Sequence, residues 1–213
     1  MKGITIGNTK CCLACIREQD TELVIWRRSL APDLQDWIDR TAAASLPDVR
    51  ILIKPDEIRP ALEPLLDDCG LRTGQMRDLL IADITDLAIE FAKITTSDCV
   101  DVRLERVNHD ACWKFHRDYV DTRLVTTYRG PTTQWVKHAH AQEAIDKQKE
   151  FQGPLERLED GDVAIFKGSQ TGTNKGIVHR SPPIEGTGLT RLLLCLNQRT
   201  NTSPDPWTKA LMH

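Results

Sequence analysis

The sequence has 213 residues, of which 40% are hydrophobic, and its 28 basic and 31 acidic side chains give a formal net charge of -3. This length and hydrophobic content support a buried core and exclude wholesale disorder. The balanced charge shows no basic stripe for nucleic acid, and no apolar run approaches the roughly 18 to 20 residues that cross a bilayer. Residues 1–12 lack the apolar stretch of a signal peptide, so we expect a cytoplasmic protein with mostly reduced cysteines.

Near the N-terminus three cysteines lie close together, and Cys12 and Cys15 have the spacing of half a zinc knuckle. Cys11 precedes this pair, but a second CxxC is absent from the sequence. Two interpretations stay open at this stage. The thiols are small core residues or ordinary cysteines, or they form a second metal or redox site.

Residues 1–97 are predicted to be a mainly helical region that packs on a sheet. After a short strand at 23–26, apolar residues recur at helical spacing over 31–46, 58–66 and 76–91. Pro32 suits a first helical turn, and Thr73 is a candidate cap of the third helix.

From residue 98 onward the apolar period changes to two, which is typical of half-buried strands. Many short strands separated by turn residues predict a small β-barrel or sandwich over 98–213, so the fold class is α+β with an N-terminal helical lobe. A polar segment at 138–150, which contains His138 and His140, is predicted to be an exposed helix or a mobile excursion. The predicted strands cover residues 100–105, 122–128, 162–167, 175–179 and 189–196.

A candidate metal site begins with His116-x-Asp118. Alternate residues of an extended chain point to one side, so the imidazole and the carboxylate can reach one point. His179, at the end of a later predicted strand, adds a second imidazole. Two histidines and one carboxylate suit Fe(II), Mn(II) or Zn(II) and leave one face of an octahedral metal open. Arg191 opens the last strand and is placed to hold the carboxylate of a chelating 2-oxo acid.

This pattern resembles the Fe(II)/2-oxoglutarate dioxygenases of the double-stranded β-helix (cupin-like jelly-roll) fold, and within them the prolyl-hydroxylase-like branch. The resemblance covers about residues 99–198 and rests on His116-x-Asp118, the segment 161–166, His179 and Arg191. It implies Fe(II) as the metal and 2-oxoglutarate as a small-molecule cosubstrate.

Three further positions correspond to cosubstrate-binding residues of that branch. Arg123, Thr126 and Tyr128 follow the His-x-Asp motif as its members' arginine, threonine and tyrosine do, and the resemblance implies that they help bind 2-oxoglutarate. Residues 129–135 depart from the branch, since they replace its acidic Gly-Gly-x-Thr loop.

Four further motifs carry a second resemblance, and they are Cys112-x-x-Phe115-His116-x-Asp118-Tyr119, Thr127-Tyr128-Arg129-Gly130-Pro131, Gly161-Asp162-Val163-Ala164-x-x-Lys167-Gly168 and His179-Arg180-Ser181-Pro182-Pro183. Through them most of the chain resembles the bacterial family named domain of unknown function 1826. The association of that family with zinc-homeostasis GTPases implies a link to metal supply.

Four residues are candidate auxiliary groups of the site. In a straight strand Cys112 would share the metal-facing side with His116, as a thiolate near the metal or as a buried core thiol. Lys167 and Arg180 are candidates for recognising an anion, or are barrel-edge charges that discourage strand pairing. Trp135 faces substrate or packs in the core.

The leading hypothesis is an Fe(II)/2-oxoglutarate-dependent oxygenase acting on a substrate that the sequence does not name. One alternative is a non-oxidative protein that binds Zn(II) through the same triad. Another is an interaction module without metal, in which Asp118 and His179 are hydrogen-bonded to each other.

Overall fold

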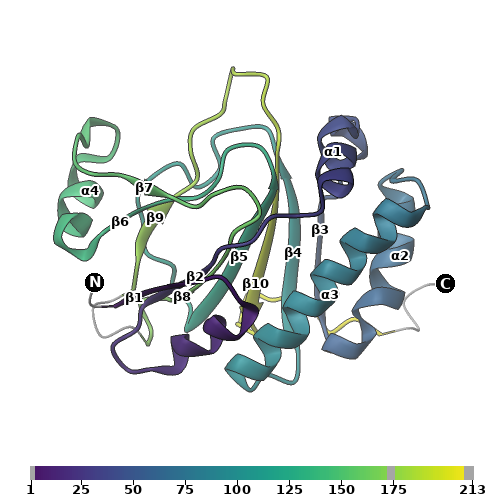
Figure 1. Cartoon of the computed structure of the whole chain (residues 1–213), viewed down its shortest axis with the longest axis horizontal. Helices are drawn as coiled ribbons and strands as arrows, with labels where there is room; N and C mark the ends of the chain where they lie inside the picture. Colours follow the sequence, from purple (N-terminus) through teal and green to yellow (C-terminus); the bar gives the residue numbers. More distant parts are fainter. Residues whose placement is uncertain (1–2, 172–175, 209–213) are drawn as a thin grey trace.

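The structure, a computed structural model, describes residues 3–171 and 176–208 of the chain. Helices and two facing sheets make up the molecule, which confirms the predicted α+β class. Figure 1 shows α3 lying across the large sheet, with α1 and α2 near one end of the molecule and α4 at the other. Among the described residues, no helix combines the length and apolar character needed to cross a membrane.

The three predicted N-terminal helices are confirmed. They are α1 Pro32–Arg40, α2 Ile58–Asp68 and α3 Gln75–Thr95. The first is shorter than predicted because Thr41 turns to an extended conformation, and a short 3-10 turn at Ala43–Ser45 then leads to buried Leu46. The third begins after Gly74, and Thr73 does not cap it.

Within the described residues, seven strands form the large sheet, in the order β1-β2-β8-β5-β10-β4-β3. All neighbours are antiparallel except β1 and β2, which are parallel. The bounds of these strands are β1 Ile4–Gly7, β2 Leu23–Trp26, β3 Val49–Ile53, β4 Val100–Val107, β5 Thr122–Arg129, β8 Val163–Lys167 and β10 Arg191–Gln198.

A small sheet, in the order β7-β6-β9, covers part of the other face of the large sheet. Beyond it, a cluster that includes Phe115 and Val178 packs against the short helix at the end of the molecule. The remaining elements are β6 Gln134–Val136, β7 Glu156–Arg157, β9 Val178–Arg180 and α4 Ala141–Lys147, with 3-10 turns at Lys10–Arg17, Pro55–Glu57, His138–His140 and Gln148–Glu150. The helical prediction for 138–150 is thus confirmed, whereas the N-terminal residue of the predicted 175–179 strand lies outside the described residues.

Side-chain alternation divides the core between the two faces of the large sheet. Leu124 and Leu194 point to the face that the N-terminal helices cover, where the largest apolar cluster lies. Val125 and Cys195, one residue further along each strand, point toward the small sheet and a second apolar cluster. The helices therefore close one face, and the face between the two sheets remains for a functional site.

Four strands were not predicted, namely β1, β3, β6 and β7. They have two to five residues, which is too short to display a period of two. Three of them are edge strands of their sheets. Because β1 to β3 join the same sheet as β4, β5, β8 and β10, residues 1–97 supply strands as well as helices.

Candidate metal centre

The three predicted metal ligands converge on one point between the sheets. His179 lies on β9, and His116 pairs with it through two backbone hydrogen bonds, of 3.0 and 3.1 Å, as a single bridge beside the small sheet. Asp118 follows two residues later, in the connection to β5. The sequence analysis assumed an extended chain at His116-x-Asp118, and in the structure His116 alone of this segment pairs with a strand.

The ligand atoms of this triad face one another. His116 Nε2 lies 3.4 Å from Asp118 Oδ1, and His179 Nε2 lies 3.3 Å from Asp118 Oδ2. All three ligand atoms lie within 4.8 Å of one another, and this is the one such group of histidine, cysteine and acidic side chains within the described residues. The site is a half-open one, since Asp118 and His179 are buried and the His116 side chain is 32% exposed.

Backbone carbonyls orient both imidazole rings. His116 Nδ1 lies 2.7 Å from the carbonyl oxygen of Lys114, and His179 Nδ1 lies 3.1 Å from that of Ile177. A carbonyl oxygen only accepts, so each Nδ1 carries a proton. Each Nε2 faces the triad, where it donates to Asp118 when protonated and offers a lone pair to a metal when it is not. This arrangement is usual for metal-binding histidines.

Asp118 is held in its ionised form. Burial by itself raises the pKa of this carboxyl, but hydrogen bonds from His116 and His179 and the charge of Arg123 together bring the pKa well below its usual range. Arg123 Nη1 lies 2.7 Å from Asp118 Oδ2. Two neutral imidazoles and one ionised carboxylate fit a divalent transition metal such as Fe(II).

A cavity of about 250 Å³ adjoins the triad, and His116, His179 and Arg191 all line it. The Arg191 side chain enters from β10 and is only 1% exposed. Its Nε donates to the carbonyl oxygen of Pro131 at 2.7 Å, and its Nη1 donates to Ser181 Oγ at 2.6 Å.

The guanidinium of Arg191 lacks a carboxylate partner within the described residues, and its buried Nη2 has no hydrogen-bond partner there. Burial lowers the pKa of Arg191 to about 10. A buried cation of this kind is stabilised when a carboxylate enters the cavity and accepts from its free nitrogen.

The structure places Thr126 and Tyr128 away from this cavity. Both side chains point to the helix-covered face of β5, as their shared parity with Leu124 requires. Tyr128 is fully buried and donates to Asp83 Oδ2 at 2.7 Å, beside Arg28, and burial raises its pKa well above the usual value. Neither residue is brought together with the triad.

Arg123 does lie at the site, but in a different role from the predicted one. It contacts the ligand Asp118, and its Nε donates to Asn197 Oδ1 at 2.7 Å. Its guanidinium is therefore committed to positioning a candidate metal ligand.

Three of the four auxiliary candidates do not line the cavity beside the triad. The Lys167 ammonium donates to the carbonyl oxygens of Glu18 and Gln19, at 2.7 and 3.1 Å. The Arg180 guanidinium donates to the side chain of Gln134 and stacks on Phe115, 4.2 Å from the ring centre.

Trp135 belongs to the apolar cluster between the sheets and is 5% exposed. It pairs across the strands with His179 and supports that ring in the core.

Cys112 lines the cavity, yet the predicted extended geometry is wrong. Its φ of 53° places it in a turn, and the side chain is exposed instead of buried. The carbonyl oxygen of Cys112 accepts from the amide of Ser181 at 2.9 Å. The turn therefore helps to place the hydroxyl that contacts Arg191.

The cysteine group at the N-terminus lies on the 3-10 helix Lys10–Arg17. Cys11 is exposed and contacts Thr9, while Cys12 and Cys15 pack against the helix-side core. Within the described residues, these cysteines do not belong to any group of three or more histidine, cysteine or acidic side chains placed to hold a metal ion. His138 and His140 lie on the surface turn before α4.

The sequence did not identify Ser181 or Thr133, which both line the cavity. Ser181 lies two residues after His179, so period-two alternation was the signal that placed it on the same side. Thr133 carried no such signal, because it lies in the loop before β6.

Comparison with solved structures shows the fold. Dioxygenase for auxin oxidation 1 from Arabidopsis thaliana, solved as a binary complex with 2-oxoglutarate, superposes with a TM-score of 0.55 at 10% identity, over 97% of this chain and 96% of that one. A Pseudomonas putida prolyl-4-hydroxylase gives 0.43 at 12% identity, over 88% of this chain and 100% of that one. The double-stranded β-helix predicted from the sequence is thus confirmed.

No curated protein matches the sequence. A family model does, and it covers residues 7–197, which include the triad and Arg191. The chain therefore belongs to the family described as Protein of unknown function (DUF1826).

Proposed function

We propose that this protein is an Fe(II)/2-oxoglutarate-dependent oxygenase. The triad supplies the ligand set of such an enzyme. The chain shares its fold with an auxin-oxidising dioxygenase that binds 2-oxoglutarate. The observation that carries the proposal is the buried Nη2 of Arg191, which has no hydrogen-bond partner among the described residues and lies in the cavity that both imidazoles line. A metal site alone does not require this cation, whereas a dicarboxylate that also chelates the metal does.

Each residue has a defined part in this function. His116, Asp118 and His179 would hold Fe(II), with the imidazoles fixed by the Lys114 and Ile177 carbonyls. When bound, the metal and 2-oxoglutarate supply the chemistry of the class, in which O₂ and 2-oxoglutarate are consumed, succinate and CO₂ are released, and one oxygen atom is inserted into a substrate C–H bond.

Arg191 would bind the carboxylate of 2-oxoglutarate that does not reach the metal. Pro131 and Ser181 already hold two of its nitrogens, so the side chain pays little rotamer entropy when the cosubstrate arrives. Val125, Cys195 and Leu193 line the same cavity and keep water from much of its wall.

Anaerobic protein mixed with Fe(II) and 2-oxoglutarate tests the proposal. We expect the visible charge-transfer band of a chelated 2-oxo acid, and we expect Arg191→Gln to weaken the 2-oxoglutarate affinity by about 10- to 100-fold through loss of a charge-assisted contact. Arg180→Gln is the matched control, because the Arg180 guanidinium stacks on Phe115 instead of lining the cavity.

Metal content separates the two parts of the site. His116→Ala and His179→Ala should lose Fe(II), whereas Arg191→Gln should retain it and so report that the variant is folded. A folded Arg191→Gln protein with unchanged 2-oxoglutarate affinity rules out the clamp, and a wild-type protein that binds Fe(II) without developing the band rules out the oxygenase.

A further inference from the structure

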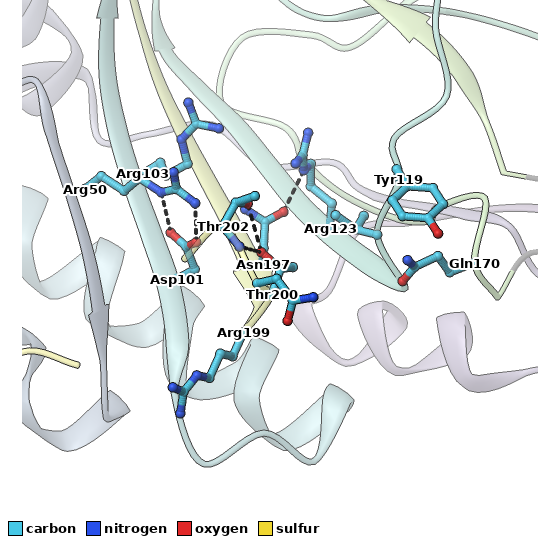
Figure 2. A pocket seen from close by; sticks show the side chains of 12 residues that line it. Arg50, Asp101, Arg103, Tyr119, Arg123, Gln170, Asn197, Arg199, Thr200 and Thr202 are labelled. Atoms are coloured by element: carbon cyan, nitrogen blue, oxygen red, sulfur yellow. Dashed lines mark hydrogen bonds and ion pairs between the residues drawn. The ribbon is translucent and has the colours of Figure 1, made fainter. Parts of the chain in front are cut away.

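A second cavity, of about 450 Å³, lies next to the first one. Arg103 and Arg123 line both cavities. We call the second one the arginine cavity because four of its lining side chains are arginines, and Figure 2 shows them with their neighbours. These arginines are Arg50, Arg103, Arg123 and Arg199.

The arginine cavity adjoins the triad through one stretch of chain. Tyr119 and Val120 line the cavity and directly follow Asp118 in the sequence. Arg123, on its wall, lies 2.7 Å from the Asp118 carboxylate. Arg123 therefore lines the arginine cavity and contacts a candidate metal ligand at the same time.

Asp101 is the one carboxylate that lines the arginine cavity, and it is already neutralised. Arg50 binds it with both Nε and Nη2, at 3.1 and 2.7 Å, and Ser203 donates to it at 2.8 Å. The Asp101 side chain is 1% exposed. Because its charge is paired and buried, it opposes an incoming anion only weakly.

The other arginines retain donor capacity. Arg199 is exposed and forms no ion pair with a carboxylate in the part of the chain that the structure describes. Arg103 contacts Glu105, yet its Nε is buried without a partner among the described residues. Asn197 adds an amide group between Arg103 and Arg123, and Gln170 adds another beside Tyr119 (Figure 2).

We infer that the arginine cavity binds an oxyanion, a carboxylate or a phosphate group, of the primary substrate. That the bound molecule is a substrate rests on the proposed function, whereas the binding of an anion rests on the cavity alone. Guanidinium forks recognise such groups with paired hydrogen bonds. The substrate class is therefore a small polar acid whose reacting carbon extends past Arg123 toward the triad.

Anion binding by metal-free protein tests the inference. Inorganic phosphate and acetate are titrated calorimetrically at constant ionic strength, with chloride as the background anion. We expect Arg199→Gln and Arg103→Gln each to weaken binding of the better anion by about tenfold or more. Arg72→Gln, which removes an exposed arginine outside the cavity, should leave the affinity unchanged.

The two anions distinguish a phosphorylated substrate from a carboxylic acid, and tighter binding of either one supports the inference. Three results overturn it: neither anion binds, Arg199→Gln and Arg103→Gln bind as well as the wild type, or only Arg191→Gln lowers the affinity. The last result would place the anion in the cosubstrate cavity. Because no metal is present, failure of the oxygenase proposal would not change this outcome.

Discussion

At the scale of single residues, strand parity decides which side chains reach the metal centre. On β5, Arg123 and Val125 face the space between the sheets, while Thr126 and Tyr128 face the helices. On β10, Arg191 and Cys195 share the inner face. A shift of one position along a strand is therefore the difference between a binding residue and a core residue.

Tyr128→Phe separates these two roles. The change removes the hydrogen bond to Asp83 in a buried site, so we expect the free energy of unfolding to fall by about 0.5–1.5 kcal/mol. Because the hydroxyl lies on the opposite face from Arg191, 2-oxoglutarate affinity should stay at the wild-type value. Urea denaturation and anaerobic titration measure the two quantities. A selective loss of 2-oxoglutarate affinity with unchanged stability would return Tyr128 to the cosubstrate site.

At the scale of elements, the turn after β8 supports the segment that carries Asp118. The amide of Gly168 donates to the carbonyl oxygen of Asp121 at 2.9 Å, and the Ser169 amide donates to that of Asp118 at 2.8 Å. A Cβ at Gly168 would lie 2.1 Å from the Val120 carbonyl oxygen and 2.8 Å from that of Asp118. Glycine is required here by close backbone contact.

Gly168→Ala should consequently move the Asp118 segment. We expect Fe(II) affinity to fall by about tenfold or more, since displacement of supporting contacts commonly costs that much in metal sites. Equilibrium dialysis under anaerobic conditions measures it. Gly186→Ala is the control, because Gly186 also lies in a turn but has no atoms near its Cβ position. An alanine at this left-handed φ of 75° should lower the free energy of unfolding by about 1–2 kcal/mol, without an effect on metal affinity. Equal metal affinities in the two variants would contradict the support role of the turn.

At the scale of the whole molecule, the triad joins two parts of the fold. His179 belongs to the small sheet, and Asp118 leads into β5 of the large sheet. A metal held by both would link the sheets on the side that the helices do not cover. Binding to the folded state alone stabilises a protein by mass action.

Metal should therefore raise the thermal stability. With Fe(II) at 100 times its dissociation constant, the free energy of unfolding should rise by about 2.7 kcal/mol. This rise corresponds to an increase of about 5–10 °C in Tm for a domain of this size. Anaerobic calorimetry with and without Fe(II) measures the shift, and Asp118→Ala should abolish it. An equal shift in that variant would indicate that the stabilising ion binds elsewhere, with the Cys11, Cys12 and Cys15 group as the first place to look.

The fold was predictable where local sequence patterns are distinct. The three helices and β4 show their apolar period in the sequence, and β2, β5, β8 and β10 are short runs rich in β-branched or aliphatic residues. The β1 and β3 strands complete the large sheet but are defined by pairing with distant neighbours, so local pattern could not identify them. The candidate site divides in the same way: His116, Asp118 and His179 were recognisable as a set, whereas Pro131 and Ser181, which accept hydrogen bonds from Arg191, were not.

The sequence by itself identified the candidate metal ligands and their companion: two imidazoles, one carboxylate and one arginine. Only the tertiary structure decided which further side chains join them. It placed Arg123 on Asp118, turned Tyr128 toward the helices, and brought Arg50 and Arg199 to the wall of the neighbouring arginine cavity. The reason is that residue types and local periods are written along the chain, whereas contacts between strands depend on register and parity, which packing of the whole core fixes.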